Sequence, residues 1–151
     1  MRTLGNILWH VPFLGFMSAF LNFLVGGLFV ITIIGAPIGL GLIQLSKFLL
    51  SPFSSAMISK NELGVEQNSL WKSFSLVVRI IYFPIGLILA TITIFQIVAL
   101  FISIIGIPAA LVAAKGLSTT FNPVNKVCVP KAVQDELNMR KAQQQVATHL
   151  R

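Results

Sequence analysis

The chain of 151 residues is 56% hydrophobic and only 10% charged, and its mean hydropathy is +0.88. Soluble domains average about 45–50% apolar and about 25% charged residues, so this composition excludes an ordinary soluble domain. Eleven Lys and Arg against four Asp and Glu give a net charge of +7. Long stretches of the chain carry no charge, so the basic balance indicates lipid, and not nucleic acid, as the partner.

The residue types needed for catalysis or metal binding are scarce. There is one cysteine, Cys128, and the two histidines, His10 and His149, are far apart in the chain. The four acidic residues lie in segments that we expect to be exposed, without the spacing of metal ligands. We therefore expect no enzymatic activity, no metal and no cofactor.

Two apolar blocks dominate the chain. Residues 3–46 and 80–114 contain no Lys, Arg, Asp or Glu, and both blocks are longer than the roughly 20 residues that cross a bilayer once. Each block is therefore predicted to turn or break. The predicted organisation is a first membrane repeat at 2–53, a polar connector at 54–72, a second membrane repeat at 73–124 and a polar, helical cytoplasmic tail at 125–151.

The two membrane segments share a motif. Residues 31–37, Ile-Thr-Ile-Ile-Gly-Ala-Pro, recur at 102–108 as Ile-Ser-Ile-Ile-Gly-Ile-Pro, at an offset of 71 residues. The same offset brings Pro52 onto Pro123. We interpret the pattern as a tandem duplication of a unit with two short spans, which predicts an all-α membrane protein with about four transmembrane helices.

The Gly-x-Pro element of each repeat predicts a helix break, because proline removes a backbone donor and clashes with the preceding turn. One interpretation is a packed kink capped by a nearby hydroxyl, and the other is a discontinuous helix that forms a polar site near the bilayer midplane, as in many transporters. The candidate pathway residues of the second interpretation are Asn22, Thr32, Gly35, Pro37, Gln44, Gln96, Ser103, Gly106 and Pro108.

The distribution of Lys and Arg predicts the orientation. Both the connector and the tail are rich in these residues, so both are expected in the cytoplasm. This predicts a multi-pass protein with both termini inside. Lys47 and Lys115 follow the two breaks by about two to three helical turns, and we expect them at a cytoplasmic mouth or among lipid headgroups.

The opening residues 2–9, Arg-Thr-Leu-Gly-Asn-Ile-Leu-Trp, and the repeated Ile-Ile-Gly-x-Pro with a second proline fifteen residues later resemble the YccF family of small bacterial inner-membrane proteins. The resemblance covers about residues 2–125. Lys115 falls where the family commonly carries a lysine, whereas Gln44 occupies the equivalent position of the first repeat. The resemblance implies an integral protein of the bacterial inner membrane, without an established biochemical activity.

Two functional hypotheses remain. The first is a homo-oligomeric ion channel or small-solute transport element built from the broken helices. The second is a non-transport membrane module, a lipid-interacting or regulatory subunit whose tail docks a cytoplasmic partner. The apolar blocks contain no Asp or Glu to carry protons, which weighs against a proton-coupled transporter.

Overall fold

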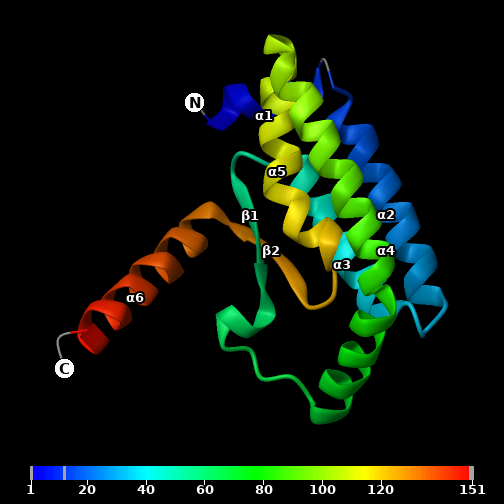
Figure 1. Ribbon diagram of the computed structural model, residues 1–151, viewed down its shortest axis with the longest axis vertical. Helices are drawn as coiled ribbons and strands as arrows, with labels where there is room; N and C mark the ends of the chain where they lie inside the picture. Colours follow the sequence, from blue (N-terminus) through cyan, green and yellow to red (C-terminus); the bar gives the residue numbers. More distant parts are fainter. Residues whose placement is uncertain (1, 12, 150–151) are drawn as a thin grey trace.

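The computed structural model describes residues 2–11 and 13–149, so that Arg151, which contributes to the charge of the tail, lies outside the described residues. The elements are α1 (Arg2–His10), α2 (Gly15–Ile31), α3 (Ala36–Leu50), β1 (Ser55–Ser59), η1 (Lys60–Leu63), α4 (Ser69–Ile102), η2 (Ile104–Gly106), α5 (Ile107–Phe121), β2 (Lys126–Pro130) and α6 (Lys131–His149). Figure 1 shows their arrangement.

The described chain is mostly helical, in line with the predicted class, but it also contains two strands. The all-α prediction is therefore incomplete, since β1 lies in the predicted connector and β2 in the predicted tail. Each strand has only five residues, too few for alternation of apolar and polar residues to stand out in the sequence.

The four apolar helices form two hairpins, in which α2 packs along α3 and α4 packs along α5. The first hairpin turns at residues 32–35, where Ile33 has a positive φ of 59°. The prolines Pro37 and Pro108 lie at the start of α3 and α5, where a missing N–H breaks no helical hydrogen bond. The Gly-x-Pro segments thus begin the second helix of each hairpin, and do not interrupt a single span.

The offset of 71 residues extends to the element boundaries. It carries α3 onto α5 and β1 onto β2, and it carries α2 onto the last half of α4, residue for residue. The first half of α4 contains the counterpart of α1. In the first half of the chain α1 and α2 meet at 77°, whereas α4 continues through Pro84 as one helix of 34 residues.

The strands join the two halves. β1 and β2 pair antiparallel, with Met57 opposite Cys128, Ser55 opposite Pro130 and Ser59 opposite Lys126. Adding 71 to the number of a β1 residue gives the equivalent β2 residue. By this rule the pair Ser55–Pro130 is equivalent to the pair Ser59–Lys126, and the central pair Met57–Cys128 is equivalent to itself. The two halves are therefore related by an approximate two-fold axis through the Met57–Cys128 pair.

The elements form layers of increasing polarity. In Figure 1, α2 and α4 lie on the side away from the sheet, α3 and α5 lie next to the sheet, and α6 extends on the other side. Large apolar side chains of α2 and α4 are exposed, while the core contains Leu45 and Phe48 of α3 and Ala109 and Val112 of α5. α6 has no buried residue.

By length and composition, two helical stretches in the described part of the chain are candidate membrane spans. They are α4 and residues 104–121, and a third exists if the bent α1–α2 pair is counted as one span. α3 is apolar but has only 15 residues.

The two hairpin turns lie at opposite ends of the molecule (Figure 1). α3 and α5 are antiparallel neighbours, because the chain after α3 shares a pocket with the start of α5, and the end of α5 approaches Gly41 in the middle of α3. Four crossings with connector and tail on one side would require both turns on the other side. The antiparallel pairing of β1 with β2 inverts the second hairpin, so the structure differs from that expectation.

Candidate functional site

The predicted pathway residues do not converge. The amide Nδ2 of Asn22 donates to the carbonyl of Ser18 at 2.9 Å, and Gln96 is exposed on α4. Thr32 and Ser103 are exposed at the two opposite turns. Gly35, Pro37 and Gly106 are buried and Pro108 is half-buried within the hairpins.

The first turn satisfies its own polar groups. The Thr32 hydroxyl donates to the carbonyl of Phe29 at 2.7 Å and accepts from the N–H of Gly35 at 3.2 Å. In the second turn the N–H of Gly106 donates to the carbonyl of Ser103 at 2.8 Å. The first turn is therefore capped by a hydroxyl and the second by a backbone hydrogen bond, and these contacts lower the cost of placing each turn in an apolar medium.

Gln44 and Lys115 occupy equivalent positions and each reaches into the other half of the chain. The Gln44 carbonyl Oε1 accepts from the N–H of Cys128 at 3.2 Å. The Lys115 ammonium donates to the carbonyl of Pro52 at 3.3 Å and lies 4.7 Å from the centre of the Phe53 ring. These contacts give both side chains a structural role at the junction between the halves, while Lys47 is exposed near the end of α3.

Two buried aromatic residues make equivalent anchors. Trp9 Nε1 donates to the carbonyl of Leu49 at 2.8 Å, and the Tyr82 hydroxyl donates to the carbonyl of Thr120 at 3.2 Å. The two acceptors are 71 residues apart. In each half, the hydrogen bond therefore connects the second helix of the hairpin to the segment that precedes the first helix of that hairpin.

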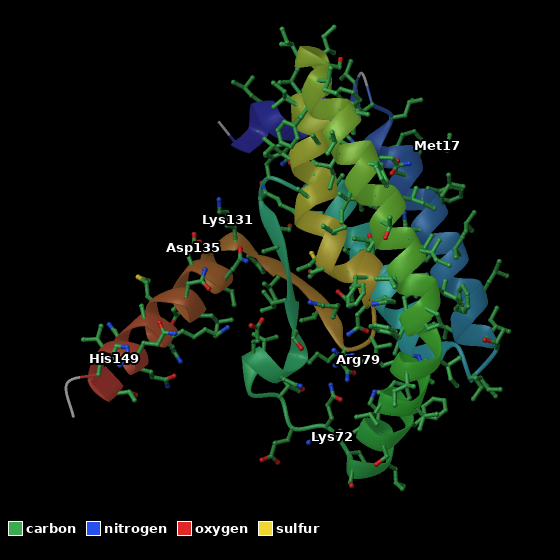
Figure 2. The ribbon with its side chains drawn as sticks, viewed as in Figure 1. Met17, Lys72, Arg79, Lys131, Asp135 and His149 are labelled. Carbon is green, nitrogen blue, oxygen red and sulfur yellow. The ribbon has the colours of Figure 1, made fainter. Side chains whose placement is uncertain are left out.

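A polar pocket of about 220 Å³ opens where the lower part of α4 faces the sheet. Figure 2 shows Lys72 and Arg79 on this part of α4. The pocket is lined by Ser59, Asn61, Lys72, Ser75, Leu76, Arg79, Asn122, Val124, Asn125 and Lys126. It contains three cationic side chains and no carboxylate, so it is suited to an anion.

Ser75 gives the pocket an unusual feature. Its side chain is 1% exposed, and its hydroxyl has no hydrogen-bond partner. A buried polar group without a partner costs about 1–3 kcal/mol. Burial also lowers the pKa of Lys126, an effect that the neighbouring carboxylate of Glu62 opposes and Arg79 reinforces.

Sequence reasoning missed this site. Lys72 and Arg79 precede the charge-free part of α4, while Lys126 lies in a strand that the sequence does not predict. The packing of α5 along α4 brings Lys126 near the helix, and the pairing of β1 with β2 adds Ser59 and Asn61 to the same place. No local pattern reveals such long-range contacts.

The counterpart of this pocket at the other end of the molecule is apolar. It has a volume of about 270 Å³ and is lined by Leu4, Gly5, Leu8, Phe53, Ile107, Pro108 and Leu111. At the offset of 71, Leu4 corresponds to Ser75, Leu8 to Arg79 and Phe53 to Val124. Some equivalent positions of the two halves therefore line an apolar pocket at one end of the molecule and a polar pocket at the other.

The tail contacts the connector. Lys141 of α6 and Glu62 of η1 form an ion pair of 2.6 Å, and the hydrogen bond from Lys141 is the main cause that lowers the pKa of Glu62. α6 also contacts both strands. The predicted connector and tail are thus neighbours in space.

Among the described residues, no group of three His, Cys, Asp or Glu is placed to hold a metal ion. In comparisons with known proteins, residues 4–55 match the family model described as YccF, inner membrane component domain. The match covers α1 from Leu4 onward, the first hairpin and the first residue of β1. Neither the curated proteins nor the solved structures give a match.

Proposed function

The chain carries the inner membrane component domain of the YccF family and belongs to that family, and from this premise we propose that it is a non-transport membrane module. Its two helical hairpins are held in lipid, and its sheet, connector and tail face the cytoplasm. The observation that carries the proposal is the apolar surface of α2 and α4, combined with the absence of a shared polar face among the described residues of the candidate pathway.

The outer helices have the surface of lipid-embedded helices. A helix that is apolar around its whole circumference belongs in a protein core or in a membrane, and neither α2 nor α4 is in a core. The exposed large apolar side chains of α2 are Phe16, Met17, Phe20, Leu21, Phe23, Leu24, Val25, Leu28, Phe29 and Ile31.

The sheet supports a position of the hairpins along the membrane surface, without complete crossings. A two-stranded sheet has two edges with unpaired N–H and C=O groups, which lipid cannot satisfy. The sheet therefore belongs in water. The helices that pack beside the sheet must then lie at the level of the sheet, outside the centre of the bilayer, and cannot cross it there. At 1.5 Å per residue, α2 and α3 are about 25 and 22 Å long, shorter than a hydrocarbon core of roughly 30 Å. α4, with 34 residues, is long enough to cross, so for this helix the argument rests on the sheet alone.

The turns support the same arrangement. Ile33 and Ile34 in the first turn and Ile104 and Ile105 in the second are each more than 70% exposed. A turn with this composition is stable in lipid because its polar groups bond within the turn. We therefore place both turns in the membrane, in place of the four crossings expected from the charge pattern. The Glu62–Lys141 ion pair supports a common side for connector and tail.

The transport hypothesis requires a different arrangement. Since the polar pathway residues of one chain bond to nearby backbone groups, to the sheet in the case of Gln44, or lie far apart, a pathway would have to form between subunits of an oligomer. Bilayer recordings of the purified protein test this: we expect no conductance. An anion-selective conductance that falls when Lys47 and Lys115 are replaced by Gln would contradict the proposal and support the channel hypothesis.

Cysteine labelling tests the membrane arrangement. In a Cys128→Ser background, single cysteines replace Lys60, Lys141, Ile34 and Ile105, and a membrane-impermeant maleimide is added to right-side-out and inverted vesicles. We expect Lys60→Cys and Lys141→Cys to react only in inverted vesicles, and the two turn cysteines to react only after detergent is added. Labelling of Ile34→Cys or Ile105→Cys in right-side-out vesicles would show a crossing and overturn the proposed arrangement.

A further inference from the structure

We propose that the polar pocket beside the lower part of α4 binds a phosphate group, held by Lys72, Arg79 and Lys126 and by the hydroxyl of Ser75. The chemistry is that of a phosphate ester, which occurs in anionic phospholipid headgroups and in small soluble phosphates. The site does not depend on the proposed function, but its lipid form rests on the position of α4 in the membrane.

The cations of the pocket have no protein carboxylate as partner. The ion pairs within the described residues join Glu136 with Arg140 and Glu62 with Lys141. Glu62 is the acidic group whose charge acts on Lys126, and its carboxylate is already held by Lys141 at 2.6 Å. Three positive charges therefore converge on one cavity without an internal counterion.

Ser75 supplies a second, independent observation. Ser75 is one of the residues that line the pocket, and its hydroxyl is buried and has no hydrogen-bond partner in the protein. Buried hydroxyls are normally paired, so a ligand that accepts a hydrogen bond at this point explains the otherwise unsatisfied group. The three asparagines of the lining, Asn61, Asn122 and Asn125, add amide groups to the same cavity.

A phosphate group fits this set better than a carboxylate. Its oxygens can accept hydrogen bonds from an arginine fork, two ammonium groups and a hydroxyl at the same time. The volume of about 220 Å³ leaves room for a small substituent on the phosphate. Exposed apolar residues of α4, Val77, Ile80 and Ile81, follow next to the pocket and would contact the acyl chains of a lipid bound there.

Binding to the protein in neutral detergent tests the site. Phosphatidylglycerol and phosphatidylcholine are titrated separately by native mass spectrometry, and inorganic phosphate and glycerol 3-phosphate serve as competitors. The variants are Arg79→Gln, Lys126→Gln and Ser75→Ala, with Arg79→Lys to restore the charge. Lys131→Gln is the control, because it also removes one positive charge near β2, but Lys131 does not line the pocket.

We expect phosphatidylglycerol to bind at least about tenfold more weakly to Arg79→Gln and Lys126→Gln, and a few-fold more weakly to Ser75→Ala. Arg79→Lys should recover part of the loss, and Lys131→Gln should bind like the parent. Phosphatidylcholine, which has no net charge, should bind weakly throughout. Competition by millimolar glycerol 3-phosphate, with no preference for phosphatidylglycerol, would identify a soluble phosphate as the ligand at the same site.

Two results would overturn the proposal. The first is equal phosphatidylglycerol and phosphate binding by the parent, Arg79→Gln and Lys126→Gln. The second is an equal loss in the Lys131→Gln control, which would show a general effect of charge. The melting temperature of each variant identifies loss of fold, and Ser75→Ala, which removes one oxygen atom, tests the site where a charge change unfolds the protein. Because binding is measured in detergent, its failure is separate from a failure of the cysteine labelling.

Discussion

The two halves of the chain have equivalent hairpins and strands, but the pockets at the two ends of the molecule differ in polarity. Leu4, Leu8 and Phe53 line the apolar pocket, and the equivalent residues Ser75, Arg79 and Val124 line the polar pocket. The pockets lie where the segment before a hairpin meets the segment after it. The fold therefore determines where each cavity forms, while a few side chains decide whether it takes an apolar group or an anion.

A second difference between the halves concerns the segment before each hairpin. α1 is bent away from α2, while its counterpart continues into α4 as one helix. Trp9 and Tyr82 make the equivalent anchor from the two arrangements, so the anchor does not require the bend. The bend brings Asn6 onto the chain after α3, where its side chain bonds to Phe53 and Ser54.

A disulfide across the approximate two-fold axis should give the largest effect. Met57 and Cys128 are direct partners of an antiparallel pair, with a Cα separation of about 4.5–5.5 Å that suits a disulfide. We expect Met57→Cys to crosslink with Cys128 and to stabilise the fold by about 2–4 kcal/mol. Non-reducing electrophoresis and melting measure both effects.

The matched control for the crosslink is Ala56→Cys, whose partner in the sheet is Val129. Burial raises the pKa of the Cys128 thiol, so oxidation is carried out at alkaline pH, where more thiolate is present. Equal crosslinking by Ala56→Cys, or none by Met57→Cys, would contradict the register and with it the inverted relation of the halves.

Two close contacts between a glycine and a backbone carbonyl should give the next largest effect. A Cβ atom on Gly41 would lie 1.9 Å from the carbonyl oxygen of Pro123, and one on Gly86 would lie 2.2 Å from that of Phe121. Since both obstacles are backbone atoms, we expect Gly41→Ala and Gly86→Ala to lower the free energy of unfolding by about 1–3 kcal/mol. Thermal unfolding in detergent measures the loss.

Gly27→Ala is the control for these substitutions, because it lies in α2 with no atom within 4 Å of the added methyl group. It should be neutral or stabilising by up to about 1 kcal/mol through helix propensity. A loss at Gly27 equal to that at Gly41 would mean that the helices tolerate no change at any glycine, and that the close approach is not the cause.

The aromatic anchors should give a smaller effect. Tyr82→Phe removes one hydroxyl and its bond to Thr120, and we expect a loss of about 0.5–1.5 kcal/mol. Trp9→Phe removes the bond to Leu49 and also ring volume against Gly15, so its loss should be about 1–2 kcal/mol. Chemical unfolding distinguishes them; a larger loss for Tyr82→Phe would show that the two anchors are not equivalent.

The sequence predicts the mostly helical and apolar character of this fold, because that information is local. The Gly-x-Pro segments lie at the start of α3 and α5, whereas the sequence predicts a break within each repeat. The inversion of the second hairpin is not predictable in this way, since it depends on pairing Ser55–Ser59 with residues some 70 positions later. The polar pocket depends on the packing of α5 along α4 for Lys126 and on the strand pairing for Ser59 and Asn61. These long-range contacts explain why Lys72, Arg79 and Lys126 do not stand out in the sequence as a group.

The two halves also differ in the segments that follow β1 and β2, which contact each other. Breaking this contact between connector and tail should give the smallest effect on stability. Lys60 and Lys131 are equivalent residues, and their N–H groups donate to the equivalent carbonyls of Asn125 and Ser54. After them the chain forms η1 in one half and α6 in the other, and Glu62 and Lys141 connect the two. Both side chains are about half exposed, so we expect the pair to contribute at most about 1 kcal/mol to docking of the tail and to weaken with salt.

The pH dependence of docking follows from the pKa of Glu62, which the hydrogen bond from Lys141 lowers below its ordinary value of 4.5. The contribution of the pair is therefore complete above that ordinary value and is lost as the pH falls through the lowered pKa of the docked state. A spin label at the exposed Met139, in a Cys128→Ser background, should become more mobile over this acidic range.

Two variants test the cause of this transition. Glu62→Gln should give the mobile spectrum already at neutral pH and remove the acidic transition. Glu136→Gln, which breaks only the pair with Arg140 within α6, should leave the transition in place. An unchanged spectrum in Glu62→Gln would show that the contacts of α6 with the strands hold the tail without this ion pair.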